Sequence, residues 1–324
     1  MNPQLAVMAA VRGGVFTRAD ARACGYPDPE IDSLLETGAW RRIRPGTYAA
    51  HRALTLVTDE VLHLRKVYRV LRTGGSAVFA SHQSAAALHA LPLWGLDLSR
   101  VHVTSPQGRG GCVGGVHRHI RDPVGPGIQI WNKLRMVSPA RAVVEVASTS
   151  PAAPAGVLTD AALYAGLVTN RSLKRAVSDH GNERAVATIS RACAESASVA
   201  ESRLRQLLAE AGLPTPSTAP PPDVDPSEPT RPDIAALWFP EERTVVEFEP
   251  RFPFWCEESE PDDEEPEAEA LHPDPAAPDP LETCWISWPE LSEPAVVIDR
   301  IRASFARASR RTGVRHFDLA RARP

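Results

Sequence analysis

The chain of 324 residues lacks the features that mark several large classes of protein. Its five cysteines are scattered and include no Cys-x-x-Cys pair, which argues against a disulfide framework or a zinc finger and favours reduced thiols. No apolar run approaches the ~18 residues that a membrane helix needs, and the start has no basic leader. We therefore expect a soluble, cytoplasmic protein with no membrane partner.

Lysine is also scarce, and negative charge is concentrated in one place. Only Lys66, Lys133 and Lys174 occur, all in the first 174 residues. Residues 257–282 hold twelve acids and no Lys or Arg, so a chain of net charge -4 has a remainder of net charge +8. This Pro-rich acidic tract cannot build a core and is predicted to be a disordered insertion. The basic remainder is compatible with nucleic-acid contact.

The length predicts two or three domains, and an apolar content of 43% is ample for their cores. We place the domains at residues 1–52, 53–195 and 196–324. In residues 1–52 the sequence predicts three short helices and a hairpin that turns at Pro45-Gly46. Thr17 is the expected N-cap of the second helix and Asp28 that of the third. This order is the plan of a winged helix.

The middle region predicts a mixed α+β domain. A helix is expected over residues 59–72, and two more begin after the N-caps Ser81 and Ser138. Residues 100–105 alternate as a strand, and residues 116–121 are its expected hairpin partner across a Gly-rich segment.

The last region predicts an α/β domain. A helix after Ser198 carries an apolar stripe and ends near Gly212. Two apolar strands, "DIAALWF" and "RTVVEFE", precede the acidic tract, and "TCWISW" is a third strand. A basic amphipathic helix follows. The fold class is therefore α/β and α+β multidomain.

Three blocks of sequence resemble known bacterial proteins. The block "GGVFTRADARACGY…IDSLLETGAWRRIRPGTYAA" is similar to the winged helix of AbiEi-type antitoxins, which belong to type IV toxin–antitoxin systems. "ASHQSAAALHALPLWGLDLSRVHVTSP" and "MVSPARAVVEVAS" resemble the region that follows it in those proteins. The region from "AESRLRQLLAEAGLP" onward resembles very-short-patch-repair endonucleases of the PD-(D/E)XK superfamily. The resemblance implies double-stranded DNA as a partner, and a cognate toxin or other protein as a second one.

The nuclease resemblance also implies a catalytic set. Its acids fall on Glu201, Asp233, Glu247 and Glu249, and the last three are the implied ligands of Mg²⁺. A magnesium ion held by carboxylates activates water for attack on a phosphodiester.

Each acid also has a structural explanation. Glu201 fits a capping box with Ser198. Asp233 can pair with Arg231, and a basic partner such as Arg203 or Arg251 can neutralise Glu247.

Departures from the family pattern lead us to expect an inactive nuclease site. The family's Asp is Glu249 here, and its Gly is Pro250. The region holds no lysine to stabilise the developing charge, and the acidic tract that follows repels a phosphate backbone. No cofactor is expected, and Mg²⁺ is required only if the site is active.

The expected DNA contacts are arginines outside the helix that enters a groove in most winged helices. That helix, residues 29–37, carries three acids and no basic residue. The predicted phosphate contacts are Arg18, Arg22, Arg41, Arg42 and Arg44. The alternative is a winged helix that binds protein. Cys112, His117 and His119 do not predict a metal site, because soft-metal sites usually have four convergent ligands and no second cysteine lies close in the sequence.

The leading hypothesis is a DNA-binding transcriptional regulator of the antitoxin kind that carries an inactive nuclease-fold domain. The alternatives are a Mg²⁺-dependent DNA endonuclease and a protein-interaction module that uses the acidic tract.

Overall fold

The computed structural model describes residues 2–12, 14–50, 58–121, 127–131, 133–217, 235–248 and 281–312. The chain forms two compact units, Met1–Ala194 and Glu195–Pro324. The predicted boundary between residues 52 and 53 lies inside the first unit. Asp233 and Glu249 of the predicted catalytic set fall outside the described residues, as does nearly all of the acidic tract.

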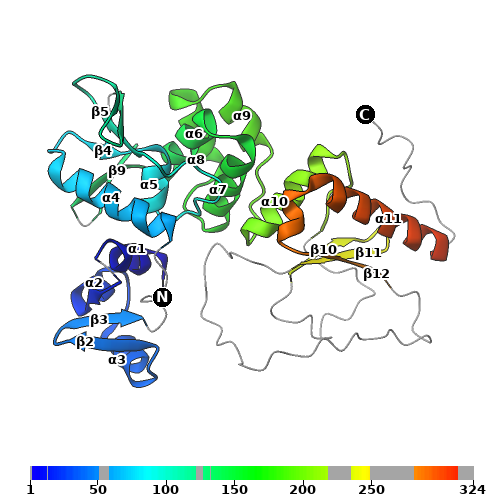
Figure 1. The fold of residues 1–324 in the computed structure, drawn as a ribbon, viewed down its shortest axis with the longest axis horizontal. Helices are drawn as coiled ribbons and strands as arrows, with labels where there is room; N and C mark the ends of the chain where they lie inside the picture. The colour runs from blue at the N-terminus through cyan, green and yellow to red at the C-terminus, as the bar shows by residue number, and fades with distance from the viewer. Residues whose placement is uncertain are drawn as a thin grey trace. The chain divides into compact units, whose positions relative to one another are not determined.

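The first unit begins with a winged helix (Figure 1, blue). Three helices surround a three-stranded antiparallel sheet of order β1-β3-β2. Its elements are α1 (Pro3–Val11), β1 (Phe16–Thr17), α2 (Arg18–Ala23), α3 (Asp28–Glu36), β2 (Trp40–Arg44) and β3 (Thr47–Ala50). The core centres on Trp40, which is 1% exposed and packs edge-on against Phe16 and Tyr26.

Local signals set the helix starts of the winged helix. Thr17 caps α2 as predicted, and Asp20 completes a reciprocal capping box with it. The prediction that Asp28 caps α3 is wrong by one residue, since Pro27 occupies the N-cap position. The Asp28 carboxylate accepts a hydrogen bond from Arg18 instead. The first turn of α3 is thereby tied to α2 by an ion pair rather than closed by a side-chain cap.

The rest of the first unit is a mixed α+β fold built on a six-stranded sheet of order β6-β7-β5-β4-β9-β8. Its strands are β4 (Phe79–Ala80), β5 (Val101–Ser105), β6 (Gly111–Val113), β7 (Val116–Ile120), β8 (Ile128–Trp131) and β9 (Leu134–Val137). Its helices are α4 (Asp59–Thr73), α5 (His82–Leu88), α6 (Pro139–Thr149), α7 (Ala152–Tyr164), α8 (Asn170–His180) and α9 (Glu183–Ser190). Ser138 caps α6 as predicted, whereas Ser81 occupies the N-cap position of α5 without a side-chain cap bond.

The predicted hairpin between β5 and β7 is wrong. These strands pair in parallel, with His102 opposite His117 and Thr104 opposite His119. The hairpin partner of β7 is the short strand β6. Gly114 and Gly115 join β6 to β7 with φ of 57° and 78°, and two successive positive φ angles suit a tight turn between antiparallel strands. The Gly-rich segment therefore reverses the chain once more than expected.

The second unit places two helices against a three-stranded sheet (Figure 1). Its elements are α10 (Val199–Glu210), β10 (Ala235–Phe239), β11 (Thr244–Phe248), β12 (Glu282–Ile286), η1 (Pro289–Ser292) and α11 (Pro294–Thr312). Strand β11 pairs antiparallel with β10 and parallel with β12. Alternate side chains of the strands, including Val246 and Phe248, join Leu204, Leu208 and other residues of both helices in one core. Both helices thus cover the same face of the sheet.

Among the described residues, no helix combines the length and the apolar character that crossing a membrane requires.

Candidate functional site

Two of the predicted DNA contacts are engaged by acids of α3. Arg18 pairs with Asp28, at 2.9 Å between Nη1 and Oδ1, and with Asp32. Arg22 lies 3.5 Å from the other oxygen of Asp28. The hydrogen bond from Arg18 to Asp32 is the largest cause that raises the pKa of Arg18 above its ordinary value. A phosphate has to displace these carboxylates before it contacts α2.

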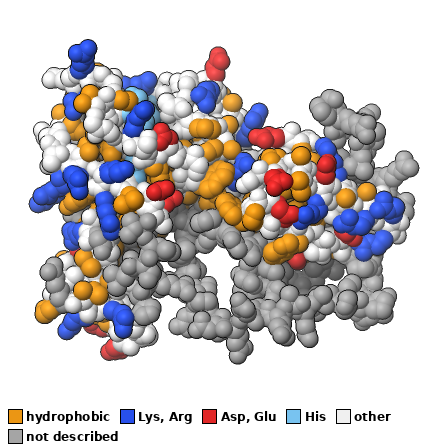
Figure 2. Space-filling view, in the orientation of Figure 1, with side chains coloured by type: hydrophobic (Ala, Val, Ile, Leu, Met, Phe, Trp, Pro, Cys, Tyr) orange, Lys and Arg blue, Asp and Glu red, His pale blue; other side chains and the backbone are white. Residues whose placement is uncertain are grey.

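The described arginine side chains of the β-hairpin are exposed, whereas those of α2 pair with acids of α3. Arg41 and Arg42 lie on β2 with exposed side chains. The Arg42 guanidinium carbon is 6.0 Å from the centre of the Tyr48 ring, a cation–π distance that holds it at the edge of the winged-helix core. The side chain of Arg44 lies outside what the structure describes. Figure 2 shows that Lys and Arg side chains are spread over the first unit on the face in view.

Glu201 is held by protein groups in the second unit. Its backbone N–H donates to Ser198 Oγ at 3.1 Å, which is half of the predicted capping box. The carboxylate accepts from the Ala197 N–H at 3.0 Å, one residue before the N-cap. Its other oxygen accepts from Arg205 Nε at 3.0 Å, with both side chains almost fully buried. The contacts with Ala197 and Arg205 account for a buried carboxylate without a metal ion.

Glu247 lies on the sheet face opposite to α10. Its neighbours Val246 and Phe248 enter the core under the helices, and side chains alternate along a strand. Half-buried Glu247 is opposite Ala236 of β10 and Trp285 of β12. Glu201 of α10 and Glu247 of β11 therefore lie on opposite sides of the sheet. The predicted magnesium set stays a prediction, because two of its three ligands lie outside the described residues.

The last acid of the predicted acidic tract belongs to the folded sheet. Glu282 is the first residue of β12, and its carboxylate oxygens pair with Arg307 and Arg311 of α11. The predicted insertion thus ends before residue 282.

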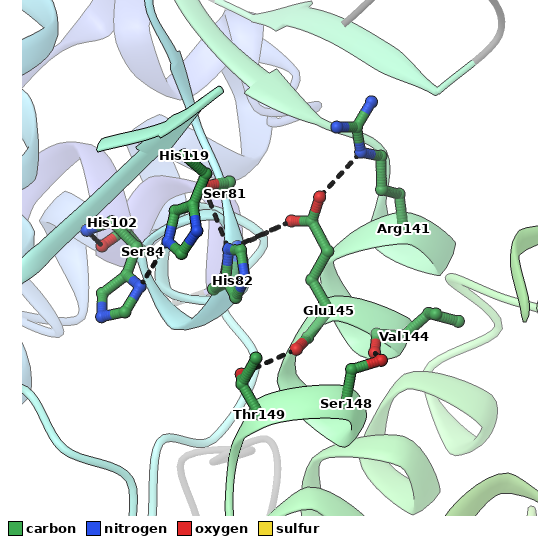
Figure 3. A network of polar contacts seen from close by, with 10 residues as sticks. All are labelled: Ser81, His82, Ser84, His102, His119, Arg141, Val144, Glu145, Ser148 and Thr149. Atoms are coloured by element: carbon green, nitrogen blue, oxygen red, sulfur yellow. Dashed lines mark hydrogen bonds and ion pairs between the residues drawn. The ribbon is translucent and has the colours of Figure 1, made fainter. Parts of the chain in front are cut away.

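A cluster of three histidines in the first unit is one that the sequence patterns do not predict. His82 of α5, His102 of β5 and His119 of β7 turn their imidazoles toward one another (Figure 3). Each offers a nitrogen, and these atoms all lie within 4.8 Å of one another. His102 Nδ1 is 3.1 Å from His119 Nε2. The rings of His82 and His119 are stacked, with centres 4.0 Å apart.

A buried ion pair fixes His82 from the side of α6. Glu145 Oε2 accepts a hydrogen bond from the His82 backbone N–H at 3.0 Å and lies 3.4 Å from His82 Nδ1. Glu145 Oε1 accepts from Arg141 Nε at 2.8 Å. The whole side chains of this ion pair are at most 4% exposed. Ser81 Oγ, at 3.2 Å, is a second neighbour of His82 Nδ1.

A fourth histidine, His63 of α4, is connected to the cluster by hydrogen bonds. His63 Nδ1 is 3.1 Å from the Leu98 carbonyl oxygen, which only accepts, so this nitrogen carries the proton. His63 Nε2 then accepts from the Ser84 hydroxyl at 3.0 Å. Ser84 Oγ in turn accepts from the His102 backbone N–H at 2.8 Å. The chain of bonds places His102 relative to α4 and α5.

Burial keeps the clustered imidazoles neutral at physiological pH. Burial is the largest cause that lowers the pKa of His82 to about 2, that of His102 to about 3 and that of His119 to about 4. Charge repulsion from neighbouring imidazoles lowers each pKa further, and for His119 the neighbour is His117. Neutral imidazole is the form that accepts a hydrogen bond or binds a metal.

The sequence pattern alone does not group these three histidines. His102 and His119 sit on strands with period-two alternation, but their proximity depends on the parallel register of β5 and β7. His82 comes from a helix terminus that no strand pattern connects to them. The sequence groups His119 with Cys112 and His117, and that set contains neither His82 nor His102.

Comparison with known proteins gives one family match and a distant structural likeness. Residues 6–51, the winged helix, match the family described as "Transcriptional regulator, AbiEi antitoxin". A search of curated protein sequences finds no match. Among solved structures, the chain is similar to the RV2827C protein from Mycobacterium tuberculosis, with 17% identity and a TM-score of 0.29 over 62% of this chain and 78% of that one. The N-terminal part therefore resembles antitoxin regulators in sequence.

Proposed function

We propose that the protein is a DNA-binding transcriptional regulator of the type IV antitoxin kind. The observation that carries this proposal is the agreement between the family match over residues 6–51 and the winged helix that the same residues form. Double-stranded DNA is the ligand that a winged helix of a regulator family takes, and a toxin is the second partner that such a family implies.

The hairpin supplies the DNA contacts in this proposal. Arg41 and Arg42 are exposed, whereas the acids of α3 occupy Arg18 and Arg22. Exposed arginines bind phosphates and fix the position of the module without reading bases. Affinity then depends steeply on salt, and the slope becomes shallower by about 0.9 for each phosphate that the protein no longer neutralises.

The second unit is proposed as a nuclease-like domain that does not cleave DNA. Its element order, a helix, three strands and a helix, supports the fold part of this proposal. The engagement of Glu201 by Arg205 and Ala197 supports the loss of cleavage, because that carboxylate already has its partners.

Gel shifts with the protein's own promoter test the regulator. Wild type is expected to bind with a steep salt dependence, and the Arg41→Ala/Arg42→Ala variant is expected to bind about tenfold or more weakly, with a salt slope smaller by about 2. Arg171→Ala, at an exposed arginine on α8, is the control and leaves binding unchanged. Equal binding by wild type and the double variant rules out the hairpin contacts.

Plasmid incubation with Mg²⁺ or Mn²⁺ tests the second unit. Neither wild type nor Glu247→Ala is expected to nick the plasmid. Metal-dependent nicking by wild type that Glu247→Ala abolishes establishes the endonuclease instead.

A further inference from the structure

We propose that His82, His102 and His119 form a binding site for a divalent transition-metal ion of the zinc class. The proposal is independent of DNA binding, since it concerns the six-stranded sheet rather than the winged helix. Three imidazoles from three different elements meet at this point (Figure 3), and their candidate ligand nitrogens all lie within 4.8 Å of one another.

The spacing of the nitrogens suits a tetrahedral ion. Zinc–nitrogen bonds of about 2.0–2.1 Å at a tetrahedral angle put two ligand nitrogens about 3.3 Å apart. The separation of His102 Nδ1 and His119 Nε2, 3.1 Å, is already close to that value. The rings of His82 and His119 are stacked, so one of them has to turn before both lone pairs point at one ion. Rotation about the Cβ–Cγ bond of histidine has a broad, shallow preference and allows this turn.

The surroundings of His82 are those of a metal ligand. In metal sites the imidazole nitrogen that does not bind the ion usually donates to a carboxylate, which orients the ring. Glu145 Oε2 stands 3.4 Å from His82 Nδ1 and is itself held through Arg141. This arrangement leaves His82 Nε2 as the ligand atom.

The backbone of His82 is a second, independent observation. Its φ is +50°, in the left-handed region that residues other than glycine rarely adopt. Such conformations persist where the surrounding structure enforces them, and they gather at functional sites. In this conformation the His82 N–H donates to Glu145, so a single carboxylate contacts both the main chain and the ring of His82.

The donor set selects the class of metal. Imidazole nitrogens favour Zn²⁺, Cu²⁺, Ni²⁺ and Co²⁺, whereas Mg²⁺ and Ca²⁺ prefer oxygen. Three protein ligands leave a fourth tetrahedral position for water. His117 stacks on His119 with ring centres 4.2 Å apart, but it is not a member of the converging set among the described residues.

Metal titration of the full chain tests the site. Protein stripped with a chelator is expected to bind one Zn²⁺ per chain by calorimetry, and Co²⁺ is expected to give the intense visible absorption of a tetrahedral site. His102→Gln and His119→Gln are each expected to weaken Zn²⁺ binding at least 100-fold. His117→Gln is the matched control on the same strand and should bind Zn²⁺ as wild type does.

The outcomes separate a metal site from a cluster of core histidines. Failure of wild type to bind Zn²⁺ or Co²⁺, or equal binding by His102→Gln and His119→Gln, overturns the proposal, as does an equal loss in His117→Gln. Should the ligand variants fail to fold, X-ray absorption of the Zn²⁺-loaded wild type decides: three imidazoles support the site, and fewer than three overturn it.

Discussion

Glu145 accepts a hydrogen bond from the backbone N–H of His82, at 3.0 Å, and so ties the first residue of α5 to α6. The same carboxylate neutralises Arg141, whose side chain is 2% exposed. Two helices that are far apart in sequence thus share one buried acid. The stability of this part of the fold therefore depends on the negative charge of Glu145 as well as on the packing of its side chain.

Glu145→Gln is expected to lower the free energy of unfolding by about 3 kcal/mol, because it leaves the buried Arg141 guanidinium without a counter-charge. Urea unfolding measures the change. Glu36→Gln, at an exposed acid on the last turn of α3, is the control and should shift the free energy by less than about 0.5 kcal/mol. A loss below about 1 kcal/mol for Glu145→Gln contradicts the importance of this ion pair.

Asp32→Asn is expected to strengthen DNA binding. Arg18 pairs with both Asp28 and Asp32, and removing the charge of Asp32 leaves one of these two carboxylates to compete with a phosphate while also removing a repulsive charge. The salt slope of binding should become steeper by about 0.9, the value of one additional neutralised phosphate. Gel shifts at several salt concentrations measure it, with Glu183→Gln on α9 as the control for a general change in charge. Unchanged affinity and salt slope in Asp32→Asn contradict a phosphate contact by Arg18.

The Glu201–Arg205 pair is expected to stabilise α10 through a direct interaction. A double-mutant cycle with Glu201→Gln and Arg205→Met should give a coupling energy of about 1–3 kcal/mol, since both side chains are almost fully buried. Replacing Arg205 together with Glu210, an exposed acid on the same helix, is the reference cycle and should give a coupling near zero. Coupling near zero for the first cycle means that Glu201 has another role.

Buried His63 makes stability depend on pH. Burial is the largest cause that lowers the pKa of His63 below its ordinary value of 6.5. As the pH falls through 6.5, the unfolded chain takes up this proton before the folded protein does. The stability present above pH 6.5 is therefore lost as the pH falls toward the folded pKa. Each pH unit in that interval costs up to about 1.4 kcal/mol.

His63→Asn isolates this contribution, because the Asn side chain retains a donor for the Leu98 carbonyl but does not titrate. Urea unfolding at pH 7.5, 6.5 and 5.5 compares the two proteins. The stability advantage of wild type should shrink as the pH falls. A constant difference across these pH values means that the pKa of His63 is the same in the folded and unfolded states.

Helix starts were predictable from the sequence where the signal is local. Thr17, Ser138 and Ser198 each cap a helix at the expected residue, because the capping hydrogen bond joins residues only three positions apart. Asp28 carries the same signal but pairs with Arg18, a contact that depends on the crossing of α2 and α3. A tertiary ion pair here overrides a local preference.

Strand pairing was predictable only in part. The strands of the second unit were expected near their observed positions, because each is a continuous apolar run. The two-residue strand β4 is too short to show alternation, and the parallel pairing of β5 with β7 depends on where β6 reverses the chain. The histidine cluster depends on that same register, so its members could not be grouped from their spacing.

The parallel pairing of β11 with β12 has a consequence for engineering the chain. Strands β11 and β12 are parallel neighbours in one sheet, so the connection between them has to return the chain from Phe248 to the start of β12. About a dozen residues suffice for a crossover of this kind, and halving a longer loop alters its closure entropy by only about 0.6 kcal/mol. A connection shortened to about that length therefore still allows β11 and β12 to pair in parallel.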